Sequence, residues 1–144
     1  MGIAHIEHQW IEKMLIDKLA WIEIKEGKVL VARSKGKDKF YIPGGKRENG
    51  ESDELAVIRE IKEELTVDLL PDSLKYFDTF SAQAHGRPAG VLVQMTCYFG
   101  DYTGTIMPDS EIEEVKWLNY HEKDQVAPVD KIIFKDLKEK GLMD

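Results

Sequence analysis

The chain of 144 residues has the usual length of one domain, and its 42% hydrophobic and 33% charged residues are typical of a globular protein rather than a disordered or fibrous one. The formal net charge of -7 argues against a surface that binds a nucleic-acid polymer by neutralising its phosphates. The single cysteine, Cys97, excludes an internal disulfide and a zinc site built from paired cysteines. We therefore expect one domain that spans residues 1–144.

No targeting segment is evident. The N-terminus, "MGIAHIEHQW", lacks the basic start and apolar core of a signal peptide. No run approaches the roughly 18 apolar residues that a membrane-spanning helix needs. We expect a cytoplasmic protein without a membrane partner.

The first elements are predicted from hydrophobic periodicity. Apolar side chains at helical spacing, including Ile3, Ile6, Trp10 and Met14, predict an amphipathic helix over residues 1–16. Its apolar face must be covered either by the protein's own core or by a second copy, and we favour a homodimer. Two strands, "LAWIEI" and "KVLVARS", flank the turn "KEGK" and predict a hairpin, and the short strand "KFYI" follows.

A loop and a helix come next. Pro43 and two glycines begin a loop that lasts to about Ser52, whose hydroxyl can cap a helix over residues 53–65. The apolar residues of this helix recur three or four apart and predict one core-facing stripe; they are Leu55, Ile58, Ile61 and Leu65. The carboxylates of Glu60, Glu63 and Glu64 are expected on the opposite side, facing away from the core.

The second half of the chain contains a long hairpin, a strand and a helix. Residues 74–84 and 90–102 are predicted as strands around the turn "HGRPAG", followed by a strand over 114–120 and a helix over about 129–140. This order predicts a layered α/β or α+β fold, with a mixed sheet and helices packed on its faces. The pattern leaves open which strands are parallel.

The three glutamates of the predicted helix suggest a metal site. Glu60 and Glu64 lie one turn apart and Glu63 lies beside them, so the three carboxylates can converge on one point. Oxygen ligands favour hard cations such as Mg²⁺ or Mn²⁺, which neutralise phosphoanhydride oxygens and lower the pKa of a bound water. The alternative is a solvated acidic helix face.

The spacing of the wider stretch is more specific. From Gly45 the chain has five residues, Glu51, seven residues, the triplet "REI" that begins at Arg59, one residue, "EE", one residue, and "TV". This resembles the Nudix box, whose pattern has glycine where this chain has Thr66. The surrounding order of elements also resembles the Nudix fold, which implies a mixed sheet sandwiched by helices.

The resemblance implies roles for particular residues. The carbonyl of Gly45 and the carboxylates of Glu60, Glu63 and Glu64 would hold the metal ions, and Arg59, paired with Glu51, would orient the glutamates. Either Glu60 or a carboxylate outside the box would activate water. Glu111, six residues before Trp117, stands where family members often supply such a carboxylate, with Glu113 and Glu114 as alternatives.

Substrate contacts are less constrained by the sequence. The basic run "RSKGKDK" offers Arg33 and Lys39 as phosphate-binding groups, against the alternative of a solvated loop. His85 either contacts substrate or is a turn histidine without a role. The resemblance implies a metal-dependent pyrophosphohydrolase that cleaves a nucleoside diphosphate linked to another moiety. We favour a nucleoside triphosphate or a small nucleotide derivative as the substrate.

Other substrates and functions remain open. Family subgroups for ADP-ribose and dinucleoside polyphosphates often carry Pro or Tyr about fifteen to eighteen residues past the box, where this chain has "AQAH". One alternative is a Nudix-fold nucleotide-binding or sensor domain without hydrolysis. Another is a Nudix-fold isomerase of isoprenyl diphosphates, which would need a catalytic cysteine, whereas Cys97 lies in an apolar predicted strand.

The one departure from the pattern, Thr66, concerns the end of the helix. The family's glycine implies a left-handed backbone there, which costs a β-branched residue roughly a kcal/mol or more. Thr66 either accepts this strain or has an ordinary conformation, with its hydroxyl bonded to a carbonyl of the last turn. We expect the left-handed conformation.

Overall fold

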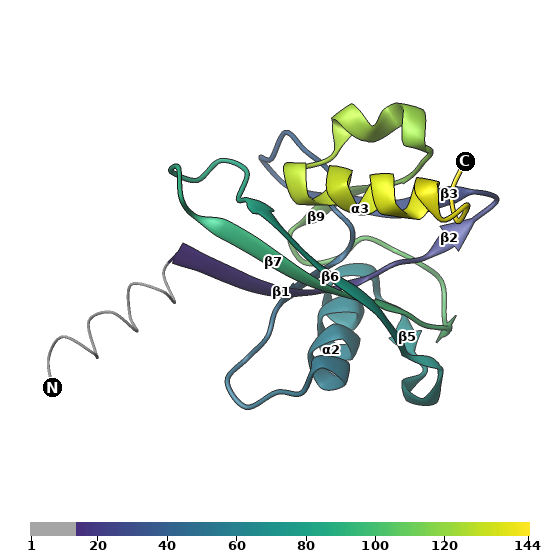
Figure 1. Ribbon diagram of the computed structural model, residues 1–144. Coiled ribbons are helices and arrows are strands. Elements are labelled where there is room, and N and C mark those ends of the chain that lie inside the picture. The colour runs from purple at the N-terminus through teal and green to yellow at the C-terminus, as the bar shows by residue number, and fades with distance from the viewer. Residues whose placement is uncertain (1–13) are drawn as a thin grey trace, which may run out of the picture.

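The computed structural model describes residues 14–144, and its central feature is a mixed sheet between two helices (Figure 1). The strands of this sheet lie in the order β4 (Gly44–Lys46), β1 (Leu15–Trp21), β7 (Leu92–Phe99) and β6 (Lys75–Gln83). Strand β1 is parallel to β7 and antiparallel to β4, and β6 is antiparallel to β7. The mixed sheet with helices on its faces confirms the predicted layered fold.

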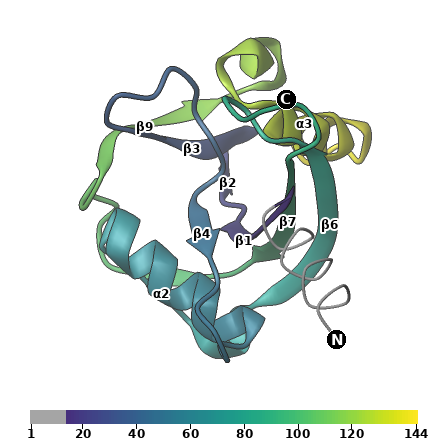
Figure 2. The same ribbon diagram turned by 90° about the vertical axis from the view of Figure 1, so that its left-hand side faces the viewer.

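Shorter elements complete the fold. A second, antiparallel sheet has the order β2 (Ile24–Lys25), β3 (Lys28–Ser34) and β9 (Ile112–Leu118), and β5 (Asp68–Leu69) pairs with β8 (Tyr102–Thr103). The α-helices of the described residues are α2 (Asp53–Leu65) and α3 (Pro128–Glu139), and the 3₁₀-helices are η1 (Pro71–Ser73) and η2 (Tyr120–Gln125). Figure 2 shows α2 and α3 on opposite sides of the strands.

Each face of the sheet has its own hydrophobic core. Leu19 and Trp21 of β1 pack with the buried residues of α2, whereas Ala20 between them packs with those of α3. Side chains alternate across a strand, so one β-strand supplies both cores. This double burial explains why "LAWI" is apolar at every position.

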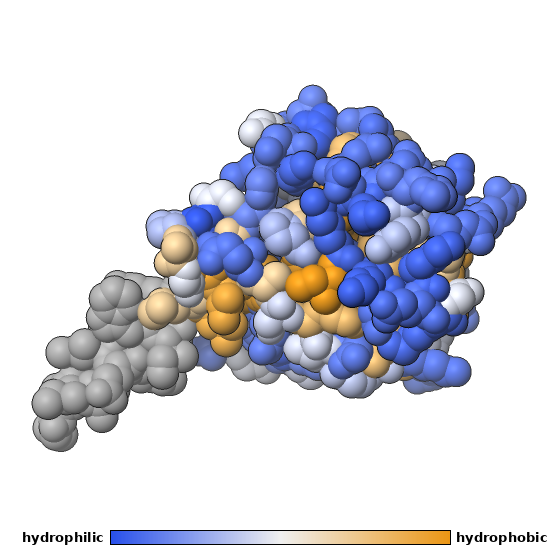
Figure 3. All heavy atoms as spheres, turned by 45° about the horizontal axis from the view of Figure 1, so that its top comes forward, coloured by the Kyte–Doolittle hydropathy of each residue, from blue (hydrophilic) through white to orange (hydrophobic). Residues whose placement is uncertain are grey.

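The outer surface is largely polar. In Figure 3, hydrophilic side chains cover the face that carries η2 and α3, and apolar side chains gather in a smaller area toward the start of β1. Met14 and Leu92 are exposed large apolar residues at that end of the sheet. Between residues 14 and 144, no helix is long and apolar enough to cross a membrane.

The predicted N-terminal helix is wrong at its end. Leu15 and Ile16 belong to β1, where they pair with Leu92 and Val93 of β7. A strand fits the apolar residues on both faces of this segment, which the helical spacing did not anticipate. Residues 1–13, on which most of the predicted helix and the expected homodimer rest, lie outside the described residues.

The predicted first hairpin is also only partly correct. Strand β3 pairs with the two-residue β2, whereas β1 belongs to the four-stranded sheet and pairs with β4 and β7. Trp21 N–H donates to the carbonyl of Pro43 and Ile22 N–H to that of Tyr98, each at 2.9 Å. The segment "KFYI" forms isolated bridges from Phe40 and Tyr41 rather than a strand.

Helix α2 has the predicted bounds, and the Ser52 hydroxyl accepts the predicted capping bond from Leu55 N–H at 3.2 Å. The predicted core-facing stripe is wrong at Leu55, which is 62% exposed, while the α2 residues buried in the core are Ala56, Val57, Ile61 and Leu65. Glu64 does not face away from the protein as predicted; it is buried. The buried face of α2 is thus not the predicted stripe. It points toward β1 and toward Gly44 of β4.

Candidate active site

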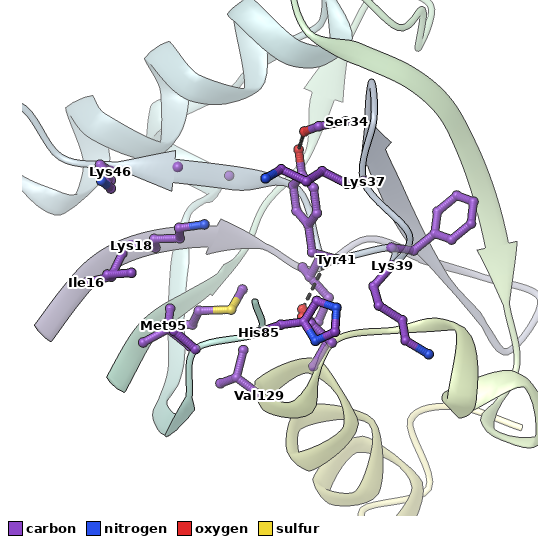
Figure 4. Close-up of a pocket in the computed structure, with 18 of the residues that line it drawn as sticks. Ile16, Lys18, Ser34, Lys37, Lys39, Tyr41, Lys46, His85, Met95 and Val129 are labelled. Atoms are coloured by element: carbon purple, nitrogen blue, oxygen red, sulfur yellow. Dashed lines mark hydrogen bonds between the residues drawn. The ribbon is translucent and has the colours of Figure 1, made fainter. Parts of the chain in front are cut away.

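A cavity of about 480 Å³ lies beside the mixed sheet, with one wall made by α2. Figure 4 shows that Lys18 of β1, Tyr41, His85 and Met95 of β7 surround the same space. The first turn of α3 closes part of it through Val129 and Asp130. A volume of this size is in the range of small-ligand sites.

Glu60 and Glu64 of α2 form an acidic wall of the cavity. Glu64 is buried, with only 4% of its surface exposed. Its Oε1 accepts a hydrogen bond from Gly44 N–H at 3.1 Å, and its Oε2 accepts one from the Tyr41 hydroxyl at 3.3 Å. Burial, together with smaller contributions from the negative charges of Glu60 and Glu111, raises the pKa of Glu64 to about 8. A cation bound at this wall would relieve that repulsion.

Glu60 lies one turn before Glu64 on the same wall, against the backbone of Gly45. A Cβ atom at Gly45 would overlap the Glu60 carboxylate, so only glycine allows this close approach. Burial raises the pKa of Glu60, and the charges of Glu63 and Glu111 act in the same direction. The Glu60 carboxylate therefore lies directly against the Gly45 backbone, and both residues line the cavity.

Arg59 connects the loop of the motif to the helix. Its Nε and Nη2 donate to the two carboxylate oxygens of Glu51 at 2.7 and 2.8 Å, and Nη2 also donates to the carbonyl of Lys46 at 3.1 Å. These bonds hold the pKa of Glu51 down at about 2. The predicted pairing of Arg59 with Glu51 is present in the structure.

The same guanidinium bonds the other glutamates. Arg59 Nη1 donates to Glu60 at 2.9 Å and to Glu63 at 3.3 Å. The Glu63 side chain is 51% exposed and does not line the cavity. The structure therefore brings Gly45, Glu60 and Glu64 together, while Glu63 lies at the outer edge of the group.

Glu111 lines the cavity just before β9, and its charge helps to raise the pKa of Glu60 and of Glu64. Its backbone carbonyl accepts a hydrogen bond from Lys35 N–H at 2.8 Å. Glu113 and Glu114 instead pair with Arg33, at 3.6 and 3.2 Å. The structure thus separates Glu111 from its two sequence alternatives.

The basic residues divide in the same way. Arg33 does not line the cavity, because its guanidinium is engaged by Glu114 and by the carbonyl of Lys37. Lys39 lines it, with Nζ donating to the carbonyl of Asp124 at 2.7 Å. Lys37 of the same basic run also lines it, as do two lysines that the sequence did not single out, Lys18 and Lys46.

His85 lines the cavity from the turn between β6 and β7. Its Nε2 lies 3.0 Å from Asp38 Oδ1, which belongs to the lysine-rich loop. The two loops at the mouth of the cavity are therefore in direct contact, although the residues are far apart in the sequence.

Asp130 is a cavity residue that sequence reasoning missed. It is 1% exposed, its Oδ1 accepts a hydrogen bond from Ile42 N–H at 2.9 Å, and burial raises its pKa to about 7. In the sequence it resembles any acidic residue in the first turn of a helix. Its burial depends on Ile42, which a local pattern cannot indicate.

Tyr41 was also missed. Its hydroxyl lies 2.8 Å from Ser34 Oγ and donates to Glu64, so it links β3 to the acidic wall (Figure 4). The aromatic residue in "KFYI" gave no signal beyond strand propensity.

Cys97 is fully buried in β7, and burial raises the pKa of its thiol. It does not line the cavity. A catalytic thiolate at the candidate site, as the isomerase alternative requires, is therefore unsupported.

The acidic wall suits a hard divalent cation in its chemistry, since its ligands are carboxylate and carbonyl oxygens. Among residues 14–144, no three His, Cys, Asp or Glu side chains are arranged closely enough to enclose an ion. Glu60 and Glu63 both bond Arg59 instead. Metal binding here would require these carboxylates to turn from the guanidinium toward the cavity.

Comparisons with known proteins find a family model, a relative and solved structures that this chain matches. The family model described as "NUDIX domain" matches residues 19–137. An uncharacterized Nudix hydrolase, YvcI of Bacillus subtilis, is 30% identical over 92 residues, which are 64% of this chain and 58% of that protein. The match therefore spans just over half the length of this relative.

Solved structures share the fold. The E. coli ORF135 protein superimposes with a TM-score of 0.68 at 24% identity, covering 90% of this chain and 95% of that one. A MutT NUDIX hydrolase from Burkholderia pseudomallei gives 0.68 at 19% identity, over 84% and 96% of the two chains. A bifunctional NMN adenylyltransferase/ADP ribose pyrophosphatase from Francisella tularensis gives 0.66 at 20%, over 96% and 46%.

Proposed function

We propose that this chain, which belongs to the Nudix hydrolase family, is a metal-dependent pyrophosphohydrolase that cleaves a nucleoside diphosphate linked to another moiety. The observation that carries the proposal is that the acidic wall of Glu60 and Glu64 and the carboxylate of Glu111 face one cavity. Burial, with a smaller contribution from the charges of Glu60 and Glu111, raises the pKa of Glu64 there to about 8. A buried carboxylate beside other carboxylates is costly to ionise, and a bound cation lowers that cost.

Gly45 and the box glutamates are the proposed metal ligands. The Gly45 carbonyl and the carboxylates of Glu60, Glu63 and Glu64 would hold Mg²⁺ or Mn²⁺. When bound, such an ion neutralises phosphate oxygens and lowers the pKa of a coordinated water. Arg59 keeps the glutamates near their working positions until the ion arrives, because its guanidinium already contacts two of them.

The remaining residues of the site would handle the proton and the substrate. Glu111, or Glu60, accepts the proton from the attacking water, which breaks one phosphoanhydride bond and releases a nucleotide. Lys39 and the other cavity lysines would neutralise the phosphates, since they lie on the same cavity as the carboxylates. The cavity is also lined by apolar side chains near Asp130, and we expect the nucleoside to bind against them.

The substrate we favour is a nucleoside triphosphate or a small nucleotide derivative. The cavity of about 480 Å³ can hold one mononucleotide and is small for two nucleosides joined by a phosphate chain. One neighbour of the same fold is described as an ADP ribose pyrophosphatase, so ADP-ribose belongs in any panel of candidates.

The test is incubation of the protein with a nucleotide panel in Mg²⁺, Mn²⁺ or EDTA, with phosphate, pyrophosphate and nucleoside monophosphate measured as products. We expect release from at least one nucleotide with either metal and none in EDTA. Tight nucleotide binding without product would instead support the alternative of a nucleotide-binding or sensor domain. Neither binding nor hydrolysis across the panel would refute both functions.

A further inference from the structure

Thr66 is the one residue of the motif that departs from the family pattern, and its side chain makes a contact that glycine cannot make. Its backbone is left-handed, with φ 70° and ψ 7°, as the sequence analysis expected. Its hydroxyl donates a hydrogen bond to the carbonyl of Met107, at 2.9 Å. The partner lies in the loop between β8 and β9 rather than in the last turn of α2.

The same loop binds the end of α2 through its backbone. Met107 N–H donates to the carbonyl of Leu65, and Asp109 N–H donates to that of Glu64, both at 2.9 Å. These carbonyls are at the C-terminus of the helix, where they lack intrahelical partners. Met107 thus both donates to the end of α2 and accepts from Thr66, so this loop is fixed directly to the helix that carries the glutamates.

The fixed segment leads straight to Glu111. Ile112 N–H donates to the carbonyl of Asp109 at 3.0 Å, which folds the intervening residues into a turn. Lys35 N–H holds the Glu111 carbonyl from the other side, at 2.8 Å. The turn brings Glu111 onto the cavity that Glu60 and Glu64 also line. The position of Glu111 relative to the acidic wall is therefore set largely by the bonds between the loop and α2.

We propose that Thr66 is a positioning residue that acts through Glu111: its hydroxyl fixes the loop to the end of α2, and so holds the Glu111 carboxylate at the metal and water site. This inference rests on the proposed function, because the role of Glu111 belongs to that function. Thr66 itself does not line the cavity. Small misplacements of a catalytic group lower turnover much more than substrate binding, so the effect should appear in kcat.

The experiment compares Thr66→Val, which removes the hydroxyl and keeps the branched shape, with Thr66→Ser, which keeps the hydroxyl. We expect Thr66→Val to lower kcat about tenfold with KM changed less than about twofold, and Thr66→Ser to stay within about twofold of the wild type. Thr103→Val, at an exposed threonine of β8, is the matched control and should have wild-type kinetics. Equal kcat for Thr66→Val and wild type, or equal losses for Val and Ser, would overturn the proposal.

A double-mutant cycle with Glu111→Gln tests whether Thr66 acts through Glu111. We expect Thr66→Val to have no further effect on kcat in the Glu111→Gln background. The carboxylate that Thr66 positions is absent there, so its position can no longer affect turnover. The same fractional loss in both backgrounds would show that Thr66 acts elsewhere, and would refute the proposal.

Two measurements keep the test independent of nucleotide turnover. Mg²⁺ affinity, measured by calorimetry, should weaken about threefold in Thr66→Val and not in Thr66→Ser, since Glu111 contributes charge to the site. Amide exchange at Met107 and Asp109 should accelerate in the same variant only. If the wild type hydrolyses no nucleotide, the proposed function fails, while these two comparisons still decide whether Thr66 positions the loop.

Discussion

Arg59 and Glu51 form a two-point ion pair, with Nε donating to Oε2 at 2.7 Å and Nη2 donating to Oε1 at 2.8 Å. The pair joins the loop that follows β4, the strand of Gly45, to the helix that carries Glu60 and Glu64. A planar guanidinium meets a carboxylate in this way with fixed geometry, which a lysine would not reproduce. The loop and the acidic wall are therefore held in register by one side chain.

The first prediction concerns this pair and acid. The pKa of Glu51 is lowered from its ordinary value of 4.5 to about 2, so the pair stabilises the fold above about pH 4.5 and loses its contribution as the pH falls toward 2. We expect Glu51→Gln to melt below the wild type at neutral pH, with the difference shrinking below about pH 4.5. Melting curves against pH measure this. A difference that grows in acid would contradict the assignment.

The second prediction concerns Glu64. Glu64→Gln should lower kcat by at least about a hundredfold, because it removes a charged ligand from the proposed metal site. In EDTA at neutral pH its melting temperature should barely change, since the amide has nearly the same shape and a carboxyl with a pKa of about 8 is mostly uncharged there. Glu139→Gln, at an exposed position of α3, is the control. Wild-type turnover in Glu64→Gln would show that the metal site is elsewhere.

Metal binding should also be visible in stability. A ligand that binds only the folded state raises its stability in proportion to the logarithm of its concentration. We expect millimolar Mg²⁺ to raise the melting temperature of the wild type by about 5 °C, and Glu64→Gln to lose most of this shift. Sodium chloride at matched ionic strength is the control. A shift of equal size in sodium chloride would mean that screening, not site binding, stabilises the fold.

Asp130 gives a prediction about the other end of the cavity. In Asp130→Asn the side-chain oxygen can still accept the hydrogen bond from Ile42, but the second oxygen becomes an amide nitrogen. We expect KM for the preferred nucleotide to rise about tenfold with kcat changed less than about threefold, because only substrate binding is affected. Asp136→Asn, on the same helix and paired with Lys140, is the control. A loss confined to kcat would place Asp130 in the chemistry instead.

The parts of the fold that were predicted well depend on local signals. Helix α2 was predicted with its observed bounds because the Ser52 cap and the acidic first turn are local features. Periodicity gave its amphipathic character but not the direction of its buried face. That direction depends on contacts with other elements: Leu19 and Trp21 of β1 pack against the helix, and Gly44 N–H bonds Glu64. The sequence pattern of the helix alone does not contain these contacts.

The same distinction applies to the site. The resemblance to the Nudix box indicated Gly45, Glu60, Glu63 and Glu64, and it indicated Glu111 by its place before Trp117. Glu63 is the one of these that does not line the cavity. Asp130 became a cavity residue only through a hydrogen bond to Ile42, which is 88 residues away. Contacts of that range leave no pattern in one sequence, so the end of the cavity away from the box could not be predicted.

The parallel pairing of β1 with β7 has a consequence for how the chain folds. Leu15–Trp21 finds its main neighbour only at Leu92–Phe99, and the intervening chain includes α2 and most of the candidate site. Pairing over such a separation requires a long loop to close. The entropic cost of closing it comes before the stabilising contacts form, and this slows folding. During synthesis on the ribosome, one edge of β1 stays unpaired until the second half of the chain has emerged. Nascent chains that stop before β7 therefore expose an apolar strand and should depend on chaperones more than the finished protein does.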